Sequence, residues 1–369
     1  MAHRARRAWR RALVVAVALS LMLVAGQLAR SSPPEEESGP AALPTTTAAP
    51  APSGDRFVRP DCPVSVKLVP ACGRWWGVSA AAHSDTPLTA GLAAFERDAG
   101  RPMDIVHTYH REDTELPTAE QIALAREPGR HRLLFLNWKP SLSHTWREVA
   151  DGAIDARIDA LARHVRAAFP ERFFLTIWHE PENDVDITPG SGMSASDYRA
   201  MFRHVVLRLR DGGVTNAVIV MNYMGSRTWG AEPWFERLYP GDDVVDWIGF
   251  DPYVEAWTEG KRPGDFADLV DRRGLNWPGF YTWWHWYHRK KPLMLAEWGI
   301  YASEERPERQ ALAFRTVAAQ IGHFAEFKAL VYFDTRLPGE YTAIDRNSEA
   351  REAYRRLGRS TPFVAPAVP

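Results

Sequence analysis

From Arg74 onward the chain alternates short apolar runs with longer amphipathic stretches. The apolar runs are nearly continuous, which is typical of strands that are buried on both faces of a parallel sheet. No internal repeat accompanies this pattern. The runs predict eight strands, over residues 75–80, 103–110, 132–138, 172–178, 216–223, 244–253, 292–299 and 328–335.

The stretches between these strands have helical periodicity. Residues 194–213 begin with a Ser/Asp capping signal and end at a Gly-Gly pair, and residues 308–324 are again amphipathic. Eight β units with helices between them predict an α/β fold, a single (β/α)8 TIM barrel. A doubly wound open sheet is the alternative, but no Gly-rich phosphate loop follows the first strand. One face of the segment 155–169 collects Ile158, Leu161, Ala162, Val165 and Phe169.

The N-terminal part of the chain differs from the rest in composition. Residues 1–11 are basic and residues 12–26 are uncharged and apolar, a run shorter than the roughly 20 residues of a membrane span. We therefore expect residues 1–29 to be a signal peptide, or else an uncleaved signal anchor. Residues 30–58, rich in Pro, Ala, Ser and Thr, predict a disordered linker, and residues 59–362 the folded domain. The protein is accordingly expected to be secreted, or tethered to the membrane by the uncleaved segment.

The two cysteines of the chain, Cys62 and Cys72, lie close together at the start of the folded domain. Export would place them in an oxidising compartment, where an even number of cysteines favours a disulfide. We expect one disulfide that anchors the beginning of the domain, with two free thiols as the alternative.

The overall charge of the chain narrows the choice of partners. Lys and Arg number 45 against 46 Asp and Glu, so no global field attracts nucleic acid. The 15 Trp residues are an unusually large number, and Trp often lines wet surfaces that bind flat, apolar-faced ligands such as sugars. We expect a monomer that binds a carbohydrate and no nucleic acid; additional Trp in the core is the alternative explanation.

Polar and aromatic residues gather at the predicted strand ends. Active sites of (β/α)8 barrels lie at the C-terminal ends of the strands, so these residues are predicted to share one rim. In chain order they are His107, Tyr109, His110, Asn137, Trp138, Lys139, His179, Glu180, Asn222, Tyr223, Asp251, Tyr253, Glu297, Trp298, Phe333 and Asp334.

Two glutamates in this set stand at the ends of the fourth and seventh strands, Glu180 and Glu297. These strands lie on opposite sides of an eight-stranded ring, so their carboxylates can face each other across a ligand. Cleavage of a glycosidic bond requires such a pair, one carboxyl group to protonate the leaving oxygen and one to attack or to activate water.

With these motifs in place, the chain resembles the retaining (β/α)8 glycoside hydrolases, and within them most closely glycoside hydrolase family 26, best known for β-mannanases. Residues 178–182, 244–254 and 291–299 carry the resemblance, which extends over residues 73–358. His179 precedes the acid, as in that family. The resemblance implies that Glu180 is the acid/base, that Glu297 is the nucleophile and that Tyr253 hydrogen-bonds the nucleophile.

The resemblance also implies a β-linked polysaccharide substrate, of the β-mannan or β-glucan type, and hydrolysis by double displacement. A weakly catalytic or non-catalytic barrel that binds carbohydrate or cell wall is the alternative. The segment Pro181-Glu182-Asn183 and Phe333 depart from the family pattern, and Glu182 is expected to face solvent or an arginine. The residues expected to bind substrate are His179, Tyr253, Trp138, His107, Tyr109, Asp251, Trp298 and Phe333, together with Trp229 and Trp257 in the following loops.

Two further patterns suggest other roles for aromatic residues and histidines. The pairs His107/His110 and His285/His288 are closely spaced, but neither has the HExxH arrangement of a zinc site, so we expect no metal and no cofactor. The aromatic segment 281–288 could form a sugar-binding platform. The helical spacing of Phe280, Trp283, Trp284 and Tyr287 instead favours packing against the barrel.

Overall fold

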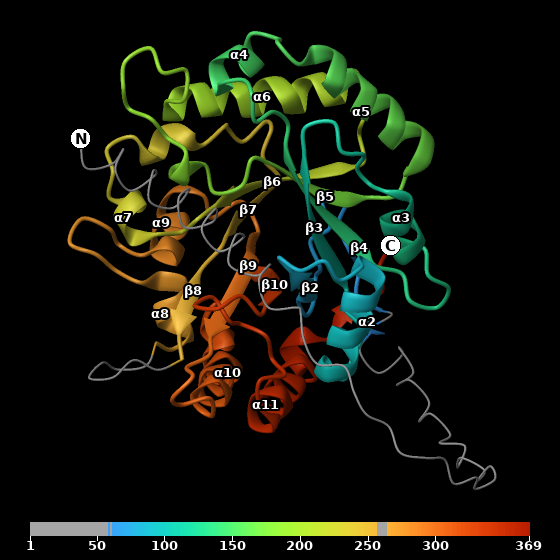
Figure 1. The fold of residues 1–369 in the computed structure, drawn as a ribbon, viewed down its shortest axis with the longest axis vertical. Helices are drawn as coiled ribbons and strands as arrows, with labels where there is room; N and C mark the ends of the chain where they lie inside the picture. Colours follow the sequence, from blue (N-terminus) through green and yellow to red (C-terminus); the bar gives the residue numbers. More distant parts are fainter. Residues whose placement is uncertain (1–57, 60, 257–263) are drawn as a thin grey trace, which may run out of the picture. The chain divides into compact units, whose positions relative to one another are not determined.

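A computed structural model describes residues 58–59, 61–256 and 264–369, so the predicted signal segment and nearly all of the predicted linker lie outside the described residues. Eight parallel strands pair in the order β10-β2-β3-β4-β5-β6-β7-β9, and β9 pairs with β10 to close the ring (Figure 1). The predicted (β/α)8 barrel is confirmed. The strands are β2 (Trp75–Ala82), β3 (Ile105–Arg111), β4 (Leu133–Lys139), β5 (Phe173–Ile177), β6 (Ala217–Tyr223), β7 (Trp247–Phe250), β9 (Leu293–Tyr301) and β10 (Phe327–Thr335).

The sixth predicted strand is split in two. After β7 the chain passes through Asp251 and Pro252 and resumes as β8 (Tyr253–Glu255), and both pieces pair with β9. Proline lacks the N–H that a ladder requires, which accounts for the interruption. Asp251 therefore lies in a gap of the barrel wall, beside the outer half of β9. A separate pair joins β1 (Val58–Arg59) to β11 (Ala365–Pro366).

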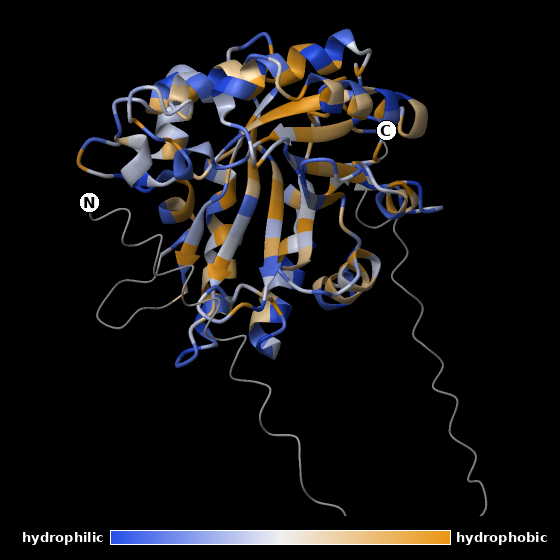
Figure 2. Cartoon of the chain, turned by 45° about the horizontal axis from the view of Figure 1, so that its top comes forward, coloured by the Kyte–Doolittle hydropathy of each residue, from blue (hydrophilic) through white to orange (hydrophobic). Residues whose placement is uncertain are grey.

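Helices surround the barrel and cover its outer face (Figure 1). In Figure 2 the strands carry long hydrophobic stretches, whereas the helices mix hydrophobic and hydrophilic residues, as expected of elements buried on one side only. The helices are α2 (Leu88–Ala99), α3 (Ala119–Ala125), α4 (Trp146–Ala150), α5 (Asp155–Ala168), α6 (Ala195–Asp211), α7 (Arg227–Gly230), α8 (Phe266–Asp271), α9 (Phe280–Tyr287), α10 (Arg309–Gln320) and α11 (Ser348–Gly358). Short 3-10 turns occupy Pro181–Asn183, Phe235–Leu238, Ile321–His323 and Thr361–Phe363. None of the helices in the described ranges is long and apolar enough to cross a bilayer.

The aromatic segment in α9 divides between core and surface. Phe280, Trp283 and Trp284 are buried, which supports the packing interpretation for these three residues. Trp286 and Tyr287 are 61% and 64% exposed, so packing was the wrong expectation for Tyr287.

The N-terminal end of the barrel interior is closed by the segment that precedes β2. Leu68 is fully buried there, and the indole N–H groups of Trp75 and Trp247 donate to the carbonyl oxygens of Leu68 and Lys67, at 2.7 and 2.6 Å. Cys62 and Cys72 form a disulfide with an S–S distance of 2.10 Å, which closes this segment into a loop. The loop therefore packs as a plug beneath the barrel.

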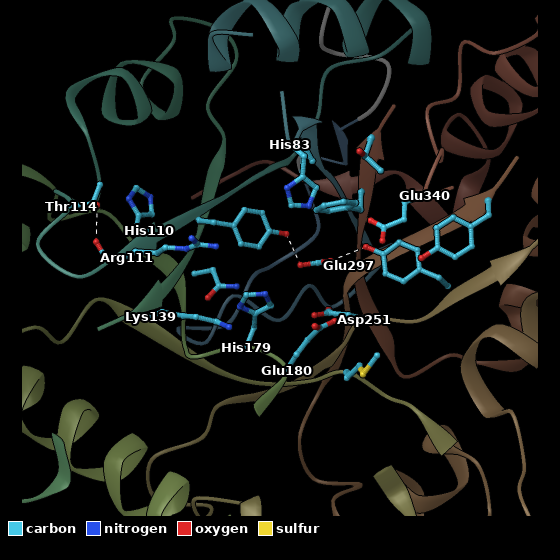
Figure 3. A pocket seen from close by; sticks show the side chains of 18 residues that line it. His83, His110, Arg111, Thr114, Lys139, His179, Glu180, Asp251, Glu297 and Glu340 are labelled. Carbon is cyan, nitrogen blue, oxygen red and sulfur yellow. Dashed lines mark hydrogen bonds between the residues drawn. The ribbon is translucent and has the colours of Figure 1, made fainter. Parts of the chain in front are cut away.

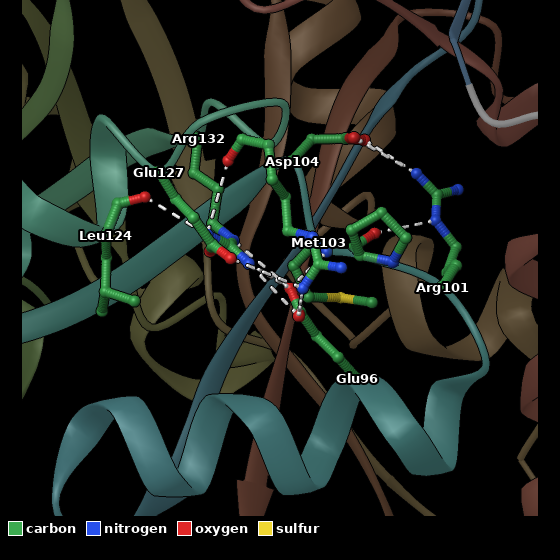
Figure 4. A network of polar contacts seen from close by, with 9 residues as sticks. Glu96, Arg101, Met103, Asp104, Leu124, Glu127 and Arg132 are labelled. Carbon is green, nitrogen blue, oxygen red and sulfur yellow. Dashed lines mark hydrogen bonds and ion pairs between the residues drawn. The ribbon is translucent and has the colours of Figure 1, made fainter. Parts of the chain in front are cut away.

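A buried ion-pair network fixes the ends of α2, β3 and β4 that lie nearest this plug (Figure 4). Glu96 of α2 accepts hydrogen bonds from the guanidinium of Arg132 at 3.1–3.3 Å and from the backbone N–H of Met103 at 2.9 Å. Arg101 pairs with Asp104 at 3.1 Å, and Asp104 in turn accepts the N–H of Trp76. These contacts set the position of β3 and β4, whose opposite ends contribute to the candidate site.

Candidate active site

A cavity of about 690 Å³ opens at the C-terminal ends of the strands, within the size range of ligand pockets (Figure 3). It brings together residues from β3, β4, β9 and β10, from the turn after β5 and from the interrupted sixth strand. The sequence-predicted residues that line it are Tyr109, His179, Glu180, Asp251, Tyr253, Glu297 and Phe333.

The backbone after β5 turns sharply and directs Glu180 into this cavity. Trp178 and Glu180 have φ angles of 56° and 50°, in the left-handed region that non-glycine residues rarely occupy. Two backbone hydrogen bonds hold the turn, from the N–H of Trp178 to Trp138 O at 2.9 Å and from the N–H of Glu180 to Asn222 O at 3.0 Å. Such strained residues persist where the surrounding structure holds them, and they concentrate at functional sites.

Glu297 projects from the middle of β9 and is held by two tyrosines. The hydroxyl of Tyr109 donates to Oε1 at 2.5 Å, and the hydroxyl of Tyr253 donates to Oε2 at 2.7 Å. The carboxylate is only 6% exposed, so these bonds replace the water that an ion of this kind would otherwise need. The ring of Phe333 lies edge-on to both tyrosines, with centroids 6.3 and 6.1 Å away.

Three carboxyl groups meet in the centre of the cavity. One oxygen each of Glu180, Asp251 and Glu297 lies within 4.8 Å of the others. Burial and the charge of Glu297 raise the pKa of Glu180 to about 8, and burial and the same neighbour raise the pKa of Asp251 well above its usual value. Burial also raises the pKa of Glu297, but the two tyrosine hydroxyls oppose that shift. At neutral pH the arrangement therefore favours a protonated Glu180 beside an ionised Glu297.

Oxygen atoms this close together could also ligate a cation. Both oxygens of Glu297 already accept a tyrosine hydroxyl, and Oδ2 of Asp251 accepts the amide of Asn222 at 2.8 Å. Each of these bonds uses part of the acceptor capacity of the cluster, whereas Oδ1 of Asp251 is buried without a partner among the described residues.

Burial favours the neutral form of two histidines of the site, His179 and His107. Burial lowers the pKa of His179 well below its usual value and the pKa of His107 to about 3. His107 stacks on Phe135 with ring centroids 4.1 Å apart, and its Nδ1 lies 3.3 Å from the hydroxyl of Tyr109. His107 thus lies beneath the cavity and supports the tyrosine that holds Glu297.

Comparison with known proteins found similarities to glycosidases. No protein-family model matches the chain. In sequence, 130 residues are 30% identical to a β-1,3-xylanase of a Vibrio species, covering 34% of this chain and 27% of that protein. A further 25% identity over 179 residues relates it to a β-1,3-xylanase of an Alcaligenes species, covering 48% and 32%. The chain thus spans less than a third of the length of either relative.

Solved structures match over a much larger part of the chain. A family 26 β-mannanase of Bacteroides ovatus aligns with a TM-score of 0.54 and 17% identity, over 85% of this chain and 94% of that one. A family 26 endo-β-1,4-mannanase of Cellulomonas fimi aligns with a TM-score of 0.54 and 16% identity, over 79% and 71%. The resemblance to glycoside hydrolase family 26 is confirmed. At these identities it is a likeness of fold.

Within this family 26-like barrel, three residues of the strands that were expected to bind substrate do not line the cavity. Trp138 is 1% exposed and donates its indole N–H to Glu112 O at 3.0 Å, and Trp298 is fully buried against Trp76 and Tyr332. His107 is buried beneath the cavity. Side chains alternate along a strand, so Trp138 and Trp298 point away from the interior because Asn137 and Glu297 point into it. That alternation was readable in the sequence.

The two tryptophans expected in loops differ in their outcome. Trp229 belongs to α7 and lies with its ring centroid 6.0 Å from that of Trp234, and it does not line the cavity. Trp257 lies outside the described residues.

Glu182 corrects another expectation, because it faces neither solvent nor an arginine. It is 1% exposed, and both of its oxygens accept the backbone N–H of Met224, at 3.0 and 3.1 Å. Burial raises its pKa to about 7. Met224 lines the cavity, so Glu182 ties the loop after β5 to the loop after β6.

The cavity also contains residues that sequence reasoning missed or did not select. Asn137, His110 and Lys139 stood in the predicted rim set, although we did not assign them to substrate. Arg111 directly follows His110 at the end of β3, so its position was a signal that could have found it. His83, Tyr301 and Glu340 come from loops or from the far end of a strand, and no motif marks them.

Proposed function

We propose that this protein is a retaining glycoside hydrolase that cleaves a β-linked polysaccharide by double displacement. The observation that carries the proposal is the pair Glu180 and Glu297, which face one cavity with an oxygen of each within 4.8 Å of the other. Retaining enzymes have carboxyl groups about 5–5.5 Å apart, whereas inverting enzymes need about 6.5–9.5 Å to admit a water molecule. The short separation supports retention.

In the first step Glu180 acts as the acid and Glu297 as the nucleophile. Glu180, which carries the proton, donates it to the leaving glycosidic oxygen while the carboxylate of Glu297 attacks the anomeric carbon. The C–O bond to the leaving sugar breaks and a glycosyl ester of Glu297 forms. Tyr109 and Tyr253 orient the attacking carboxylate, because each holds one of its oxygens.

The second step returns both groups to their starting states. Glu180, now ionised, removes a proton from a water molecule, which attacks the anomeric carbon and releases the carboxylate of Glu297. Two attacks from opposite faces retain the anomeric configuration. Glu180 must be protonated for the first step, so kcat/KM should fall as the pH rises through about 8.

The substrate class rests on the relatives. The matched proteins are named as β-1,3-xylanases and β-mannanases, which supports a β-linked polysaccharide of the mannan, glucan or xylan type. The presence of both carboxylates favours catalysis over binding alone. A screen of the purified domain on β-1,3-xylan, mannans and mixed-linkage glucans would identify the backbone.

An azide-rescue experiment tests the assignment of the two acids. Glu180→Ala should still load a dinitrophenyl glycoside, whose leaving group needs little protonation, and should then accumulate the ester intermediate. Azide needs no base, so it should restore turnover and yield a glycosyl azide of retained configuration. Glu304→Ala, which removes a surface carboxylate with 85% side-chain exposure, serves as the control and should behave as wild type. Full activity of Glu180→Ala on polysaccharide would show that another group is the acid.

We also propose that the protein is exported, either released or tethered by residues 1–29. The basic and apolar pattern of these residues supports export, and so does the disulfide between Cys62 and Cys72, since disulfides persist in oxidising compartments. Fractionation of cells that express the full chain tests this: recovery of the protein from the cytosol alone, with free thiols, would contradict it.

A further inference from the structure

Cationic side chains gather on one side of the cavity, at the ends of β3 and β4. Arg111 is the last residue of β3 and Lys139 the last residue of β4, and both line the cavity. In Figure 3 the guanidinium of Arg111 and the ammonium of Lys139 both point from this side toward the centre. The two strands pair in register, with Arg111 opposite Lys139.

The protein itself matches these two charges unequally. Within the described ranges, no carboxylate forms an ion pair with Arg111, and its guanidinium makes no hydrogen bond. Lys139 forms an ion pair with Asp184 at 3.6 Å, and its ammonium lies 5.3 Å from the centroid of the Trp178 ring. The charge of Lys139 also opposes the rise in the pKa values of Glu180 and Glu297. Arg111 therefore offers its full set of donors to whatever occupies the cavity.

A buried amide on the same strand as Lys139 points to a ligand as well. Asn137 is 1% exposed and lines the cavity, yet neither its Oδ1 nor its Nδ2 has a hydrogen-bond partner among the described residues. Nδ1 of His179 is likewise buried without a partner. Buried polar groups are rarely left unsatisfied, so a polar group of the ligand is the natural partner for both.

The opposite side of the cavity carries the other sign of charge. Glu340 lines it there, and Asp251 and Glu297 lie between the two sides (Figure 3). A negatively charged group would be repelled from that side and attracted to the β3–β4 side. The cavity is therefore polarised along its length.

We propose that the β3–β4 side of the cavity is a subsite for an anionic substituent of the polysaccharide, a carboxylate or a sulfate ester, held by Arg111, Lys139 and Asn137. The planar guanidinium of Arg111 can donate two parallel hydrogen bonds to such a group, and Lys139 adds a point charge. A neutral sugar would satisfy Asn137 but would leave Arg111 without a counter-ion. The cleavage of such a polymer rests on the proposed function, whereas its binding does not.

Matched pairs of ligands test the subsite. Poly-β-mannuronate is compared with the same polymer after its carboxyl groups are reduced, and a sulfated β-glucan is compared with the unsulfated polymer. Binding of short oligomers of each is measured by titration calorimetry with the wild-type protein, and hydrolysis is assayed in parallel. The anionic member of at least one pair should bind about tenfold more tightly or better, and the preference should shrink as salt is added. The pair that shows the preference identifies carboxylate or sulfate.

Four variants locate the preference in the cavity. Arg111→Gln and Lys139→Gln should each lower the ratio of anionic to neutral affinity, the first toward one. Arg356→Gln removes an arginine of α11 whose side chain is 61% exposed and which does not line the cavity, so it should leave the ratio unchanged. Arg111→Lys keeps the charge without the planar fork and should fall between wild type and Arg111→Gln.

The outcomes separate this inference from the proposed function. Equal or weaker binding of the anionic member in both pairs overturns the subsite, and so does a preference that survives Arg111→Gln. Cleavage of neutral polymers without an anionic preference would leave the proposed function standing and remove only the subsite. A preference for the anionic ligands without hydrolysis of any polymer would leave the subsite standing and contradict the proposed function.

Discussion

At its N-terminal end the barrel interior is filled by Leu68, Trp75 and Trp247, whereas at its C-terminal end the same interior holds Glu180, Asp251 and Glu297. The indole N–H groups of both tryptophans at the lower end are satisfied, because they donate to backbone carbonyls. At the upper end, buried polar atoms of Asn137, His179 and Asp251 have no partner among the described residues.

The difference shows that one end of the barrel contributes stability and the other end contributes the reactive groups. Apolar burial stabilises the lower end by about 25 cal/mol per Å² of area removed from water. Burial of carboxyl groups at the upper end raises their pKa values and lowers stability at neutral pH, but it also creates an acid that holds its proton near pH 7. A change at the lower end should therefore reduce stability with little effect on activity. A change of the carboxyl groups at the upper end should reduce activity without a loss of stability.

The largest effect is expected from Glu297→Ala. This change removes the group that forms the glycosyl ester, so kcat should fall roughly 10⁴-fold or more on every substrate, with a melting temperature no lower than that of wild type. Steady-state kinetics and thermal denaturation measure the two quantities. Added azide should give a product of inverted configuration, because it then attacks the sugar directly. A variant that retains a tenth of its activity would remove Glu297 from the role of nucleophile.

Trp75→Ala tests the lower end. It deletes a fully buried ring and leaves Leu68 O without its donor, so the free energy of unfolding should fall by about 3–5 kcal/mol. Chemical denaturation measures this loss, and kcat of the folded variant should stay within about twofold of wild type if the two ends act separately. Val66→Ala, at a residue of the same loop that is 64% exposed, should change stability by less than about 0.5 kcal/mol. A large drop in kcat for folded Trp75→Ala would show that the two ends are coupled.

Tyr253→Phe removes one of the two hydroxyl groups that hold Glu297. The pKa of Glu297 should then rise further, because its ionised form loses a donor. Glu297 must be ionised to attack, so the acidic limb of the kcat/KM profile should move to higher pH, and the maximum should fall about tenfold. Tyr301→Phe is the matched control, since the ring of Tyr301 stacks on Tyr253 at 5.3 Å but its hydroxyl does not bind Glu297. An unmoved acidic limb in Tyr253→Phe would mean that this hydroxyl does not tune the carboxylate.

The smallest effect concerns the stability of Glu180→Gln. The pKa of Glu180 is raised in the folded protein from 4.5 to about 8, so the folded state prefers the protonated form. The contribution of this group to stability is fully present below pH 4.5 and is lost as the pH rises through about 8. Glutamine cannot ionise, so Glu180→Gln should match wild type near pH 4 and exceed it at pH 8–9 by on the order of 1 kcal/mol. Melting curves of wild type and Glu180→Gln across this pH range measure the difference. Equal stability of the two proteins both near pH 4 and at pH 8–9 would mean that Glu180 is well hydrated.

The barrel and the position of its two central acids could be predicted from the order of residues alone. Continuous apolar runs of strand length between amphipathic helices admit few folds, because each run must be buried on both faces. In a parallel barrel all strand ends meet at one rim, so Glu180 and Glu297 could be placed opposite each other before any coordinates were known. The positions of His179 and Tyr253 followed from the same strand-end logic together with the family 26 resemblance.

Contacts that form in the folded chain set which rim residues face the cavity and how each is charged. Trp138 and Trp298 turn outward, the sixth strand breaks at Pro252, and Glu182 folds inward to bind the N–H of Met224. These outcomes depend on left-handed backbone at Trp178 and Glu180 and on partners far away in the chain, neither of which local periodicity records. The pKa of a carboxyl group, likewise, is set by burial and by neighbours that the fold brings within a few ångströms, so it could not be read from the order of residues alone.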